Sequence, residues 1–261
     1  MTPIITLTTD FGLADQYVGA MKGVLLSKCT GVCLVDITHE IPPFSIYAGT
    51  YAIAQAAPYF PARTIHLVIV DPGVGTSRRP LLIEALDQLF IAPDNGVLSL
   101  LLRGAKAFTA REISNQSLWP PNPSSTFHGR DIFAPVAAAL ASHAICPNDV
   151  GPLVEQIFLL PDLEPLESSP GLWSGRLLSV DRFGNAVTNF KTARFPANFS
   201  ILARQHQLSE FRQTFGSAGN ATIFLYPGSS GYWEIGMNRE SAAAHLELLP
   251  GDPLSLRDTI G

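Results

Sequence analysis

The alternation of strand and helix patterns over the first 70 residues limits the folds open to this chain more than any other feature. A strand, a crossover helix and a second strand form a unit in which the two strands run parallel. The order therefore predicts a parallel sheet with helices on its faces. Apolar runs predict strands at residues 4–8, 32–36 and 64–70, and helical spacing of apolar residues predicts helices at 17–28 and 46–57.

The pattern changes in the last third of the chain. Residues 159–171, LLPDLEPLESSPG, combine three prolines with polar residues, as a linker does. Beyond them, strand-like runs alternate with Gly, Asn and Pro, and little helical periodicity remains. We therefore expect an α/β N-terminal domain at residues 1–160, with a mostly parallel sheet flanked by helices. A linker at 161–171 and a smaller all-β, barrel-like C-terminal domain at 172–261 complete the predicted fold.

Two further patterns fall inside the predicted N-terminal domain. Residues 81–85 and 89–92 flank a short polar turn and predict a hairpin, and the Ala-rich segment 133–144 predicts a helix. Residues 94–96, Asp-Asn-Gly, fit a hairpin turn, but the apolar run after them suits the start of a helix instead.

Composition excludes several classes of protein. Hydrophobic residues make up 46% of the 261-residue chain, which argues against disorder, and the net charge of −5 argues against a nucleic-acid partner. No apolar run reaches the roughly 20 residues that a membrane-spanning helix needs, and the first residues lack the basic start of a signal peptide. We expect a cytoplasmic protein. Charged residues are only 15% of the chain, which fits either a surface covered in an oligomer or a dense core.

The cysteines do not predict a metal site. Cys29, Cys33 and Cys146 are scattered and form no second pair of the kind that zinc sites use. Buried free thiols in a reducing compartment are the expected state.

Carboxylates end all three predicted parallel strands, at Asp10, Asp36 and Asp71. A single Asp in such a place caps a turn or a helix. Because the carboxyl ends of parallel strands meet at one edge, three together favour a polar pocket there. The stretch VDPGVGTSRR at 70–79 is not a phosphate-binding loop, because Gly-Lys-Ser/Thr does not follow its glycines.

Two other polar clusters stand out. His128, in the segment TFHGRD at 126–131, precedes the Ala-rich helix, and both a structural and a catalytic role stay open for it. The segment VDRFGN at 180–185 leaves a predicted strand. A β-turn accounts for Gly184 and Asn185 but not for an exposed Phe183.

Seven segments, in order along the chain, match one known family. They are TTDFGLADQYVGAMKGVL, DITHEIPPF, VDPGVGTSRR, IAPDNGVLS, TFHGRDIFAP, DRFGNAVTN and SSGYWEIGMN. The chain resembles the S-adenosyl-L-methionine hydroxide adenosyltransferases, also called S-adenosyl-L-methionine hydrolases, which are relatives of fluorinase and chlorinase. The resemblance implies an α/β domain followed by a β-barrel domain. It also implies a homotrimer, in which each site lies between the N-terminal domain of one subunit and the C-terminal domain of the next.

The implied activity is hydrolysis of S-adenosyl-L-methionine to adenosine and L-methionine, by attack of water or hydroxide at ribose C5′, with no metal and no cofactor. By position, Asp71, Arg78 and His128 look like the family's water-activating triad. Arg79 is an alternative to Arg78, and either Asp71 or His128 fits the proton acceptor. The halogenases have Tyr in the place of Asp71 and Ser in the place of Gly129, so this sequence favours water over halide.

The resemblance also implies a set of substrate-binding residues. Asp10 looks like the ribose carboxylate, and Phe44 stands where the halogenases have a Trp beside the ribose and sulfonium. The implied adenine contacts are Phe183, Asn185, Phe215 and the backbone near Met237 and Arg239. Asp181 and Ser229 look like the partners of the methionine amine and carboxylate. The halogenases have Arg where this chain has Ser230.

Two alternatives to the hydrolase stay open. One is a non-catalytic sensor that binds S-adenosyl-L-methionine or adenosine, which retention of a nucleoside on purification would support. The other is a halide-dependent adenosyl halogenase, which formation of 5′-chloro-5′-deoxyadenosine in chloride would reveal.

Overall fold

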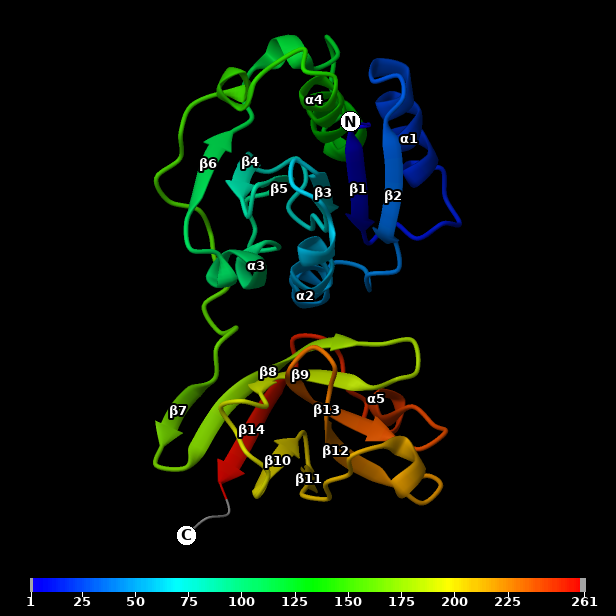
Figure 1. Ribbon diagram of the computed structural model, residues 1–261, viewed down its shortest axis with the longest axis vertical. Coiled ribbons are helices and arrows are strands. Elements are labelled where there is room, and N and C mark those ends of the chain that lie inside the picture. The colour runs from blue at the N-terminus through cyan, green and yellow to red at the C-terminus, as the bar shows by residue number, and fades with distance from the viewer. Residues whose placement is uncertain (1, 259–261) are drawn as a thin grey trace. The chain divides into compact units, whose positions relative to one another are not determined.

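The computed structural model of this protein describes residues 2–258. The chain forms two compact units, unit 1 (Met1–Leu160) and unit 2 (Pro161–Gly261). Each unit has a separate set of buried apolar residues, and Figure 1 shows each as its own group of elements.

Unit 1 is built on a six-stranded mixed sheet with the order β2-β1-β3-β5-β4-β6. The first four strands in that order run parallel, and β4 pairs antiparallel with both β5 and β6. The expected mostly parallel sheet is therefore mixed. Its strands are β1 (Ile4–Thr9), β2 (Cys33–Thr38), β3 (Ile65–Ile69), β4 (Pro80–Ala85), β5 (Gln88–Pro93) and β6 (Phe108–Glu112).

The predicted hairpin at residues 81–92 is the antiparallel part of this sheet. Leu86 and Asp87 join β4 to β5, and both have positive φ, 54° and 58°. Two consecutive residues with positive φ match the twist of the flanking strands, so they close the tightest hairpin turns. This turn reverses the chain and makes the sheet mixed.

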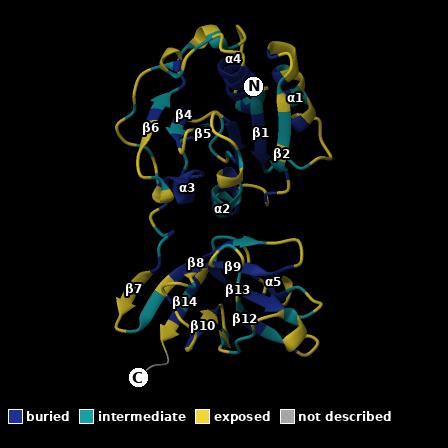
Figure 2. Ribbon diagram, in the orientation of Figure 1, coloured by how far each residue is buried: buried dark blue, intermediate teal, exposed yellow. Residues whose placement is uncertain are grey.

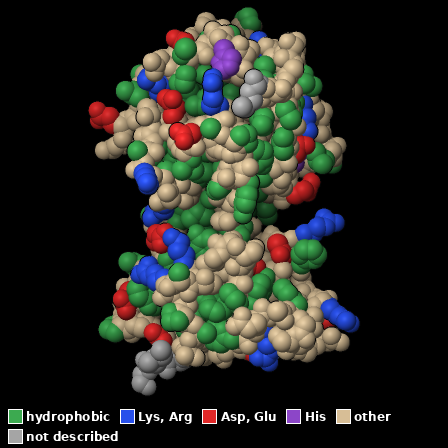
Figure 3. Space-filling model, in the orientation of Figure 1, with side chains coloured by type: hydrophobic (Ala, Val, Ile, Leu, Met, Phe, Trp, Pro, Cys, Tyr) green, Lys and Arg blue, Asp and Glu red, His purple; other side chains and the backbone are tan. Residues whose placement is uncertain are grey.

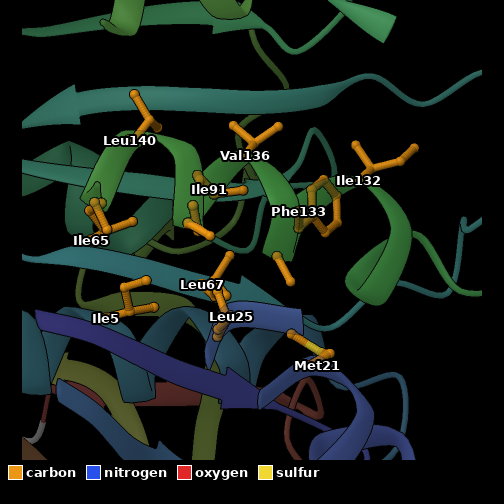
Figure 4. Close-up of a cluster of buried hydrophobic side chains, with 14 of the residues drawn as sticks. Ile5, Met21, Leu25, Ile65, Leu67, Ile91, Ile132, Phe133, Val136 and Leu140 are labelled. Atoms are coloured by element: carbon orange, nitrogen blue, oxygen red, sulfur yellow. The ribbon is translucent and has the colours of Figure 1, made fainter. Parts of the chain in front are cut away.

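Helices cover both faces of the sheet. One face carries α1 (Tyr17–Lys28) and α4 (Ala134–Ala141), whose Met21 and Val136 pack with Ile5 and Leu67 of the strands (Figure 4). The other core joins residues of α2 (Ile46–Ala56) and α3 (Ser99–Gly104) to the opposite side chains of the sheet. Burial of a sheet on both faces explains why its central strands read as continuous apolar runs (Figure 2).

The short elements mark where the predicted helices differ from the observed ones. The predicted helix 46–57 ends one residue earlier, and a 3₁₀ turn at Ala57–Tyr59 follows it because Pro58 cannot continue the α-helical ladder. The predicted helix 133–144 ends at Ala141 and is preceded by a π-helical turn at Gly129–Phe133. Further 3₁₀ turns lie at Gln116–Leu118 and Pro147–Val150.

Unit 2 is an antiparallel, nearly closed, barrel-like sheet. Its main strand order is β11-β10-β14-β8-β9-β13-β12, and β7 pairs with β8 beside this path. Phe211 bridges to Leu225, which brings the two ends of the path together. The strands are β7 (Leu166–Ser169), β8 (Leu172–Val180), β9 (Ala186–Lys191), β10 (Phe199–Ala203), β11 (His206–Leu208), β12 (Ile223–Pro227), β13 (Tyr232–Met237) and β14 (Pro253–Asp258), with one short helix, α5 (Ala242–His245), and a 3₁₀ turn at Phe215–Ser217.

Residues 161–171, predicted as a linker, belong to unit 2 and make specific contacts within it. β7 lies among them and pairs with β8. Asp162 accepts a hydrogen bond of 2.6 Å from Arg176, and Asn189 donates to the Leu163 carbonyl at 3.0 Å. Proline and polar composition predicts a linker, but these long-range partners decide the structure of the segment.

The surface carries few charges. The visible face shows many hydrophobic side chains between scattered charged ones (Figure 3), as the 15% of charged residues leads one to expect. All three cysteines are free. Cys29 is buried, but Cys33 and Cys146 are exposed, so the expectation of buried thiols holds for Cys29 alone. None of the helices between residues 2 and 258 is long and apolar enough to cross a membrane.

Candidate active site

The carboxyl edge of the parallel strands in unit 1 holds two of the three predicted carboxylates. β1 pairs with β3 as far as Thr9 opposite Ile69, so the chain leaves both strands at the same level. Asp10 and Asp71 follow these ends. Burial raises the pKa of Asp10, and the charge of Asp71 adds to the rise.

The third carboxylate, Asp36, is held by structural partners. Lys22 Nζ donates to its Oδ2 at 2.6 Å, and Nε2 of the buried His39 lies 3.0 Å from its Oδ1. His39 Nδ1 in turn lies 2.8 Å from Thr9 Oγ1. The predicted polar pocket therefore contains two carboxylates, Asp10 and Asp71. Asp36 instead belongs to a network that fixes the end of β1.

Asp71, Arg78 and His128 form one hydrogen-bonded group. The Arg78 guanidinium binds the Asp71 carboxylate through two nitrogens, with Nε donating to Oδ1 at 3.0 Å and Nη2 to Oδ2. Arg78 Nη2 also lies 2.8 Å from His128 Nδ1. The side chains of Arg78 and Asp71 are only 8% and 5% exposed. The structure thus brings together the three residues predicted as the triad.

The loop VDPGVGTSRR takes its shape from short local bonds. Val74 N–H donates to the Asp71 carbonyl, and the Thr76 hydroxyl donates to the Gly73 carbonyl at 2.6 Å. Gly75 has φ of 78°, and a Cβ there would lie 2.5 Å from the Ser125 carbonyl oxygen. Glycine at 75 therefore lets the loop that carries Arg78 pack against the segment that leads to His128.

Arg79, the alternative to Arg78, points to other partners. Its Nε donates to Asp94 Oδ2 at 2.9 Å, and its Nη2 donates to the Gln156 carbonyl at 2.7 Å. Asp94 also accepts from the Phe158 backbone N–H at 2.7 Å. Arg79 and the Asp94–Gly96 turn therefore hold the chain end of unit 1 against the sheet, and only Arg78 joins the triad.

The geometry defines the protonation state of His128. A guanidinium only donates hydrogen bonds, so Nδ1 must accept and the neutral ring carries its proton on Nε2. Burial lowers the pKa of His128, and the positive charge of Arg78 lowers it further against the opposing pull of Asp71 and Asp131. Arg78 Nη1 is buried and finds no hydrogen-bond partner anywhere in residues 2–258. The group therefore has two unused donors, Arg78 Nη1 and His128 Nε2.

Asp10 and Phe44 are neighbours. Phe44 N–H donates to Asp10 Oδ2 at 2.8 Å, which leaves the other carboxylate oxygen for a further donor. Phe44 has φ of 66°, an uncommon backbone for a bulky residue, and its side chain is 70% exposed. Strain held next to a polar site is typical of functional positions.

In unit 2, five of the predicted adenine contacts surround one cavity of about 580 Å³. Phe183 and Phe215 supply its aromatic sides, and the predicted exposure of Phe183 is confirmed, since 78% of it is accessible. The lining residues are Phe183, Asn185, Phe215, Met237, Asn238, Arg239, Glu240 and Ser241.

Sequence reasoning missed Glu240 and Ser241, and it included Asn238 only as part of the backbone at 237–239. Asn238 Nδ2 donates to the Ala218 carbonyl at 2.8 Å and so fixes the loop that carries Phe215. Asn238 is the last residue of the motif SSGYWEIGMN, so this motif is the sequence pattern that points to it. No comparable pattern marks the other two, which reach the cavity because the chain turns at Arg239, where φ is 63°.

The two predicted methionine partners lie elsewhere in unit 2. Asp181 accepts from the backbone N–H groups of Phe183 and Asn185 at 2.8 and 2.9 Å, and from Asn185 Nδ2 at 2.8 Å. It therefore builds the turn that presents Phe183. Ser229 is exposed in the turn between β12 and β13, and neither residue lines the cavity.

A larger hollow in unit 1, of about 1000 Å³, lies at the opposite edge of the sheet, near Ile4 and Ile65 at the amino ends of β1 and β3. None of the predicted site residues lines it. Size alone is a poor guide here, because the convergent polar groups gather at the carboxyl edge. Across residues 2–258, no three His, Cys, Asp or Glu side chains gather as metal ligands.

Comparisons with known proteins identify the family of the chain. The N-terminal domain profile of the SAM hydroxide adenosyltransferases matches residues 5–151, and the C-terminal domain profile matches residues 175–255. A curated (R)-S-adenosyl-L-methionine hydrolase from Salinispora tropica is 38% identical over 97% of both chains. A curated fluorinase from Actinoplanes sp. is 29% identical over 95% of both chains.

A crystal structure extends the match to three dimensions. The uncharacterized conserved protein from Thermotoga maritima superposes with a TM-score of 0.85 at 33% identity, over 97% of this chain and 99% of that one. With both domain profiles in order and a 38% identical relative along nearly its whole length, the chain belongs to the SAM hydroxide adenosyltransferase family.

Proposed function

We propose that this protein hydrolyses S-adenosyl-L-methionine to adenosine and L-methionine. The observation that carries the proposal is the bonded group of Asp71, Arg78 and His128, which leaves two donors unused beside a carboxylate. The name of the Salinispora tropica relative specifies the (R) configuration at the sulfonium. We extend that preference to this chain.

The reaction is a displacement at ribose C5′. An oxygen of water forms a bond to C5′ while the C5′–S bond breaks, and the electron pair of that bond stays on the sulfur of methionine. One proton leaves the attacking water. Because the leaving group is a neutral thioether, no acid is needed to release it. Positioning of the reactants therefore supplies most of the rate increase, which for such steps reaches roughly 7–11 kcal/mol.

The hydrogen bonds assign roles within the triad. Arg78 Nη1 and His128 Nε2 donate to the attacking oxygen, and the guanidinium charge stabilises the hydroxide character that develops on it. His128 Nδ1 is occupied by Arg78, so His128 cannot take the proton without losing that bond. Asp71 keeps a further lone pair on each oxygen and is the proton acceptor in this scheme.

The remaining predicted residues bind the substrate. Asp10 accepts from the ribose hydroxyls through the oxygen that Phe44 leaves free. Adenine lies between Phe183 and Phe215 in the unit 2 cavity, with Asn185 at its edge. Asp181 and Ser229 face the methionine end, and Phe44 lies beside the ribose and sulfonium. The scheme needs neither a metal nor a cofactor.

The working assembly in this proposal is a homotrimer, with each site built from unit 1 of one copy and unit 2 of another. Its support is the exposure of Phe44 and Phe183, at 70% and 78%, since exposed aromatic side chains beside a site are typical of interfaces. Mixed trimers of Asp71→Asn and Phe183→Ala test this, because about one site in four would then be built from two intact halves. Two inactive variants that regain no activity when mixed would exclude shared sites.

Gly129 supports water over halide as the nucleophile. A Cβ at this buried position would lie 3.1 Å from Met21 Sδ and 3.4 Å from Phe127 Cε2. The first distance is tighter than ordinary packing and the second is an ordinary contact, so the serine that the halogenases carry does not fit here unless Met21 moves.

The direct test uses chloride-free buffer in oxygen-18 water with the separated (R) and (S) epimers. We expect adenosine with the heavy oxygen at C5′, formed faster from the (R) epimer, together with L-methionine. Bound but unconverted substrate would point to a sensor instead. Formation of 5′-chloro-5′-deoxyadenosine on addition of chloride would point to a halogenase.

A further inference from the structure

Glu234 is a buried carboxylate in the middle of a β-strand. It lies in β13 and is only 8% exposed. The strand register places it opposite Tyr226 of β12, whose hydroxyl donates to Glu234 Oε2. On the other side, a Cβ on Gly228 would lie 1.9 Å from Oε1. Gly228 is thus required for the carboxylate to occupy its place beside the β12–β13 turn.

This carboxylate has no cation to balance it. Within residues 2–258, no Lys, Arg or His forms an ion pair with Glu234 or Asp181. Burial raises the pKa of Glu234; the Tyr226 hydroxyl opposes this rise, and the Asp181 carboxylate adds to it. Burying a charge without a partner is costly, so such groups persist where a ligand supplies the partner.

A polar group on the same hairpin lacks any hydrogen-bond partner among residues 2–258. Ser230 Oγ is buried in the turn between β12 and β13, and no described atom accepts or donates a hydrogen bond to it. The turn spans only Gly228 to Gly231, closed by Gly231 N–H donating to the Gly228 carbonyl at 3.1 Å. A buried carboxylate without a cation and a buried hydroxyl without a partner, on one tight hairpin, indicate that a polar ligand group completes it.

We propose that Glu234 is a specificity-determining residue that, together with Asp181, selects substrates carrying an ammonium group. The inference rests on the proposed function and names the part of the substrate that this hairpin recognises, the α-ammonium of the methionine moiety. The methionine moiety carries two cations, the sulfonium and the ammonium, and only the ammonium can donate hydrogen bonds to carboxylates. A substrate without it leaves Glu234 unpaired, and that penalty is the source of the discrimination.

A purely structural role for Glu234 predicts different results. The Tyr226 ring packs against Phe215, a wall of the adenine cavity, with centroids 5.0 Å apart. Glu234 could therefore act only by holding Tyr226. Glu234→Gln removes the charge but keeps an oxygen acceptor for the Tyr226 hydroxyl. Tyr226→Phe removes the hydroxyl and keeps the ring contact, so the two variants separate charge from support.

The experiment compares two ligands that differ only in the ammonium. They are S-adenosyl-L-methionine and its deamino analogue, with hydrogen in place of the ammonium, and adenosine is the third ligand. Calorimetry in the Asp71→Asn background, which we expect to bind without turnover, gives Kd for each. We expect Glu234→Gln to weaken binding of the first by about 10- to 100-fold and to leave the analogue and adenosine unchanged. Glu247→Gln, the same change at an exposed position of unit 2, is the matched control and should alter none of the three.

Two outcomes would overturn the inference. One is equal discrimination between the two ligands by Asp71→Asn with and without Glu234→Gln. The other is an equal loss for all three ligands in Glu234→Gln, reproduced by Tyr226→Phe, which would leave Glu234 as support for Phe215. If Glu234→Gln does not fold, Gly228→Ala displaces the same carboxylate without removing its charge and should reduce the preference for the ammonium ligand. Because Kd does not depend on turnover, a wild type that binds but never hydrolyses would contradict the proposed function alone.

Discussion

Arg78 donates a hydrogen bond to His128 Nδ1 across 2.8 Å, so the histidine serves the site in its neutral form. Protonation of His128 would remove this acceptor and place two positive charges side by side. Burial and Arg78 lower the pKa of His128 below its usual 6.5. We therefore expect kcat/KM for S-adenosyl-L-methionine to stay level as pH falls through neutrality and to decline only below 6.5. A decline that is already half complete above pH 6.5 in the pH–rate profile would contradict this.

Adjacent arginines should respond differently to the same substitution. Arg78→Lys loses the two-nitrogen grip on Asp71, and we expect kcat to fall by about 10²-fold or more with adenosine affinity retained. Arg79→Lys disturbs the Asp94 contact and should lower thermal stability by roughly 1 kcal/mol with kcat close to wild type. Steady-state kinetics and thermal melts of both variants check the pair. Equal kinetic losses would mean that Arg79 acts in the reaction after all.

Asp10→Ala should affect binding more than chemistry. Losing a carboxylate that accepts from ribose hydroxyls costs roughly 1.5–3 kcal/mol, so we expect Kd for adenosine to rise by about 10- to 100-fold. The variant also removes the hydrogen bond of 2.8 Å that Phe44 N–H donates to Asp10. Calorimetry with adenosine and 2′-deoxyadenosine measures the effect. If Asp10 binds the ribose, the variant should lose the preference for adenosine, and an unchanged preference would remove Asp10 from the ribose site.

Gly75 and Gly73 offer a matched pair in the loop that carries Arg78. Gly75→Ala would force a Cβ to 2.5 Å from the Ser125 carbonyl at a φ of 78°, so the loop must move away from the His128 segment. At Gly73 the nearest atom, Arg78 Cγ, is at an ordinary 3.4 Å. We expect kcat to fall at least about 10²-fold in Gly75→Ala and to change little in Gly73→Ala. Full activity in Gly75→Ala would show that the close approach to Ser125 is not needed.

His66 should make the protein sensitive to mild acid. Burial lowers its pKa from 6.5 to about 4, while Nδ1 lies 2.7 Å from Thr6 Oγ1. Between these values the unfolded chain binds a proton at His66 that the folded chain does not, so stability falls as pH drops from 6.5 toward 4. The full contribution is roughly 3 kcal/mol. Urea unfolding of wild type and His66→Gln at pH 7 and 4.5 measures it, with the exposed His143→Gln as control. The same pH dependence in His66→Gln and wild type would rule this group out.

Much of the fold follows from local pattern, because the strands of unit 1 are buried on both faces. β3 and the residue after it read as one apolar run, since Ile65, Leu67 and Ile69 face one core while Val68 and Val70 face the other. The predicted helix at 17–28 matches α1 because its apolar residues recur at helical spacing. No sequence pattern predicts the π-helical turn before α4, because alanines and other apolar residues fit α-helical and π-helical hydrogen bonding equally well.

Long-range partners limit what the sequence predicts of the site. Asp71, Arg78 and His128 were predicted from the family resemblance, and they do lie together. Position alone could not rank Arg78 over Arg79, because their difference lies in Asp94 and Gln156, which are 15 and 77 residues from Arg79. The sequence predicts that Asp36 ends a strand, but β2 continues to Thr38, and Lys22, which lies 14 residues earlier in the chain, pairs with the carboxylate.

The separation of the hydrophobic interior of unit 1 from that of unit 2 has an evolutionary consequence. The water-handling group and the aromatic cavity are each supported by their own packed interior. Substitutions in interiors that share no contacts have nearly independent effects. Members of this family can thus change which adenosyl compounds they accept through substitutions in unit 2, while selection keeps the chemistry of unit 1 constant. Substitutions in unit 1 can equally change the chemistry while unit 2 keeps its ligand.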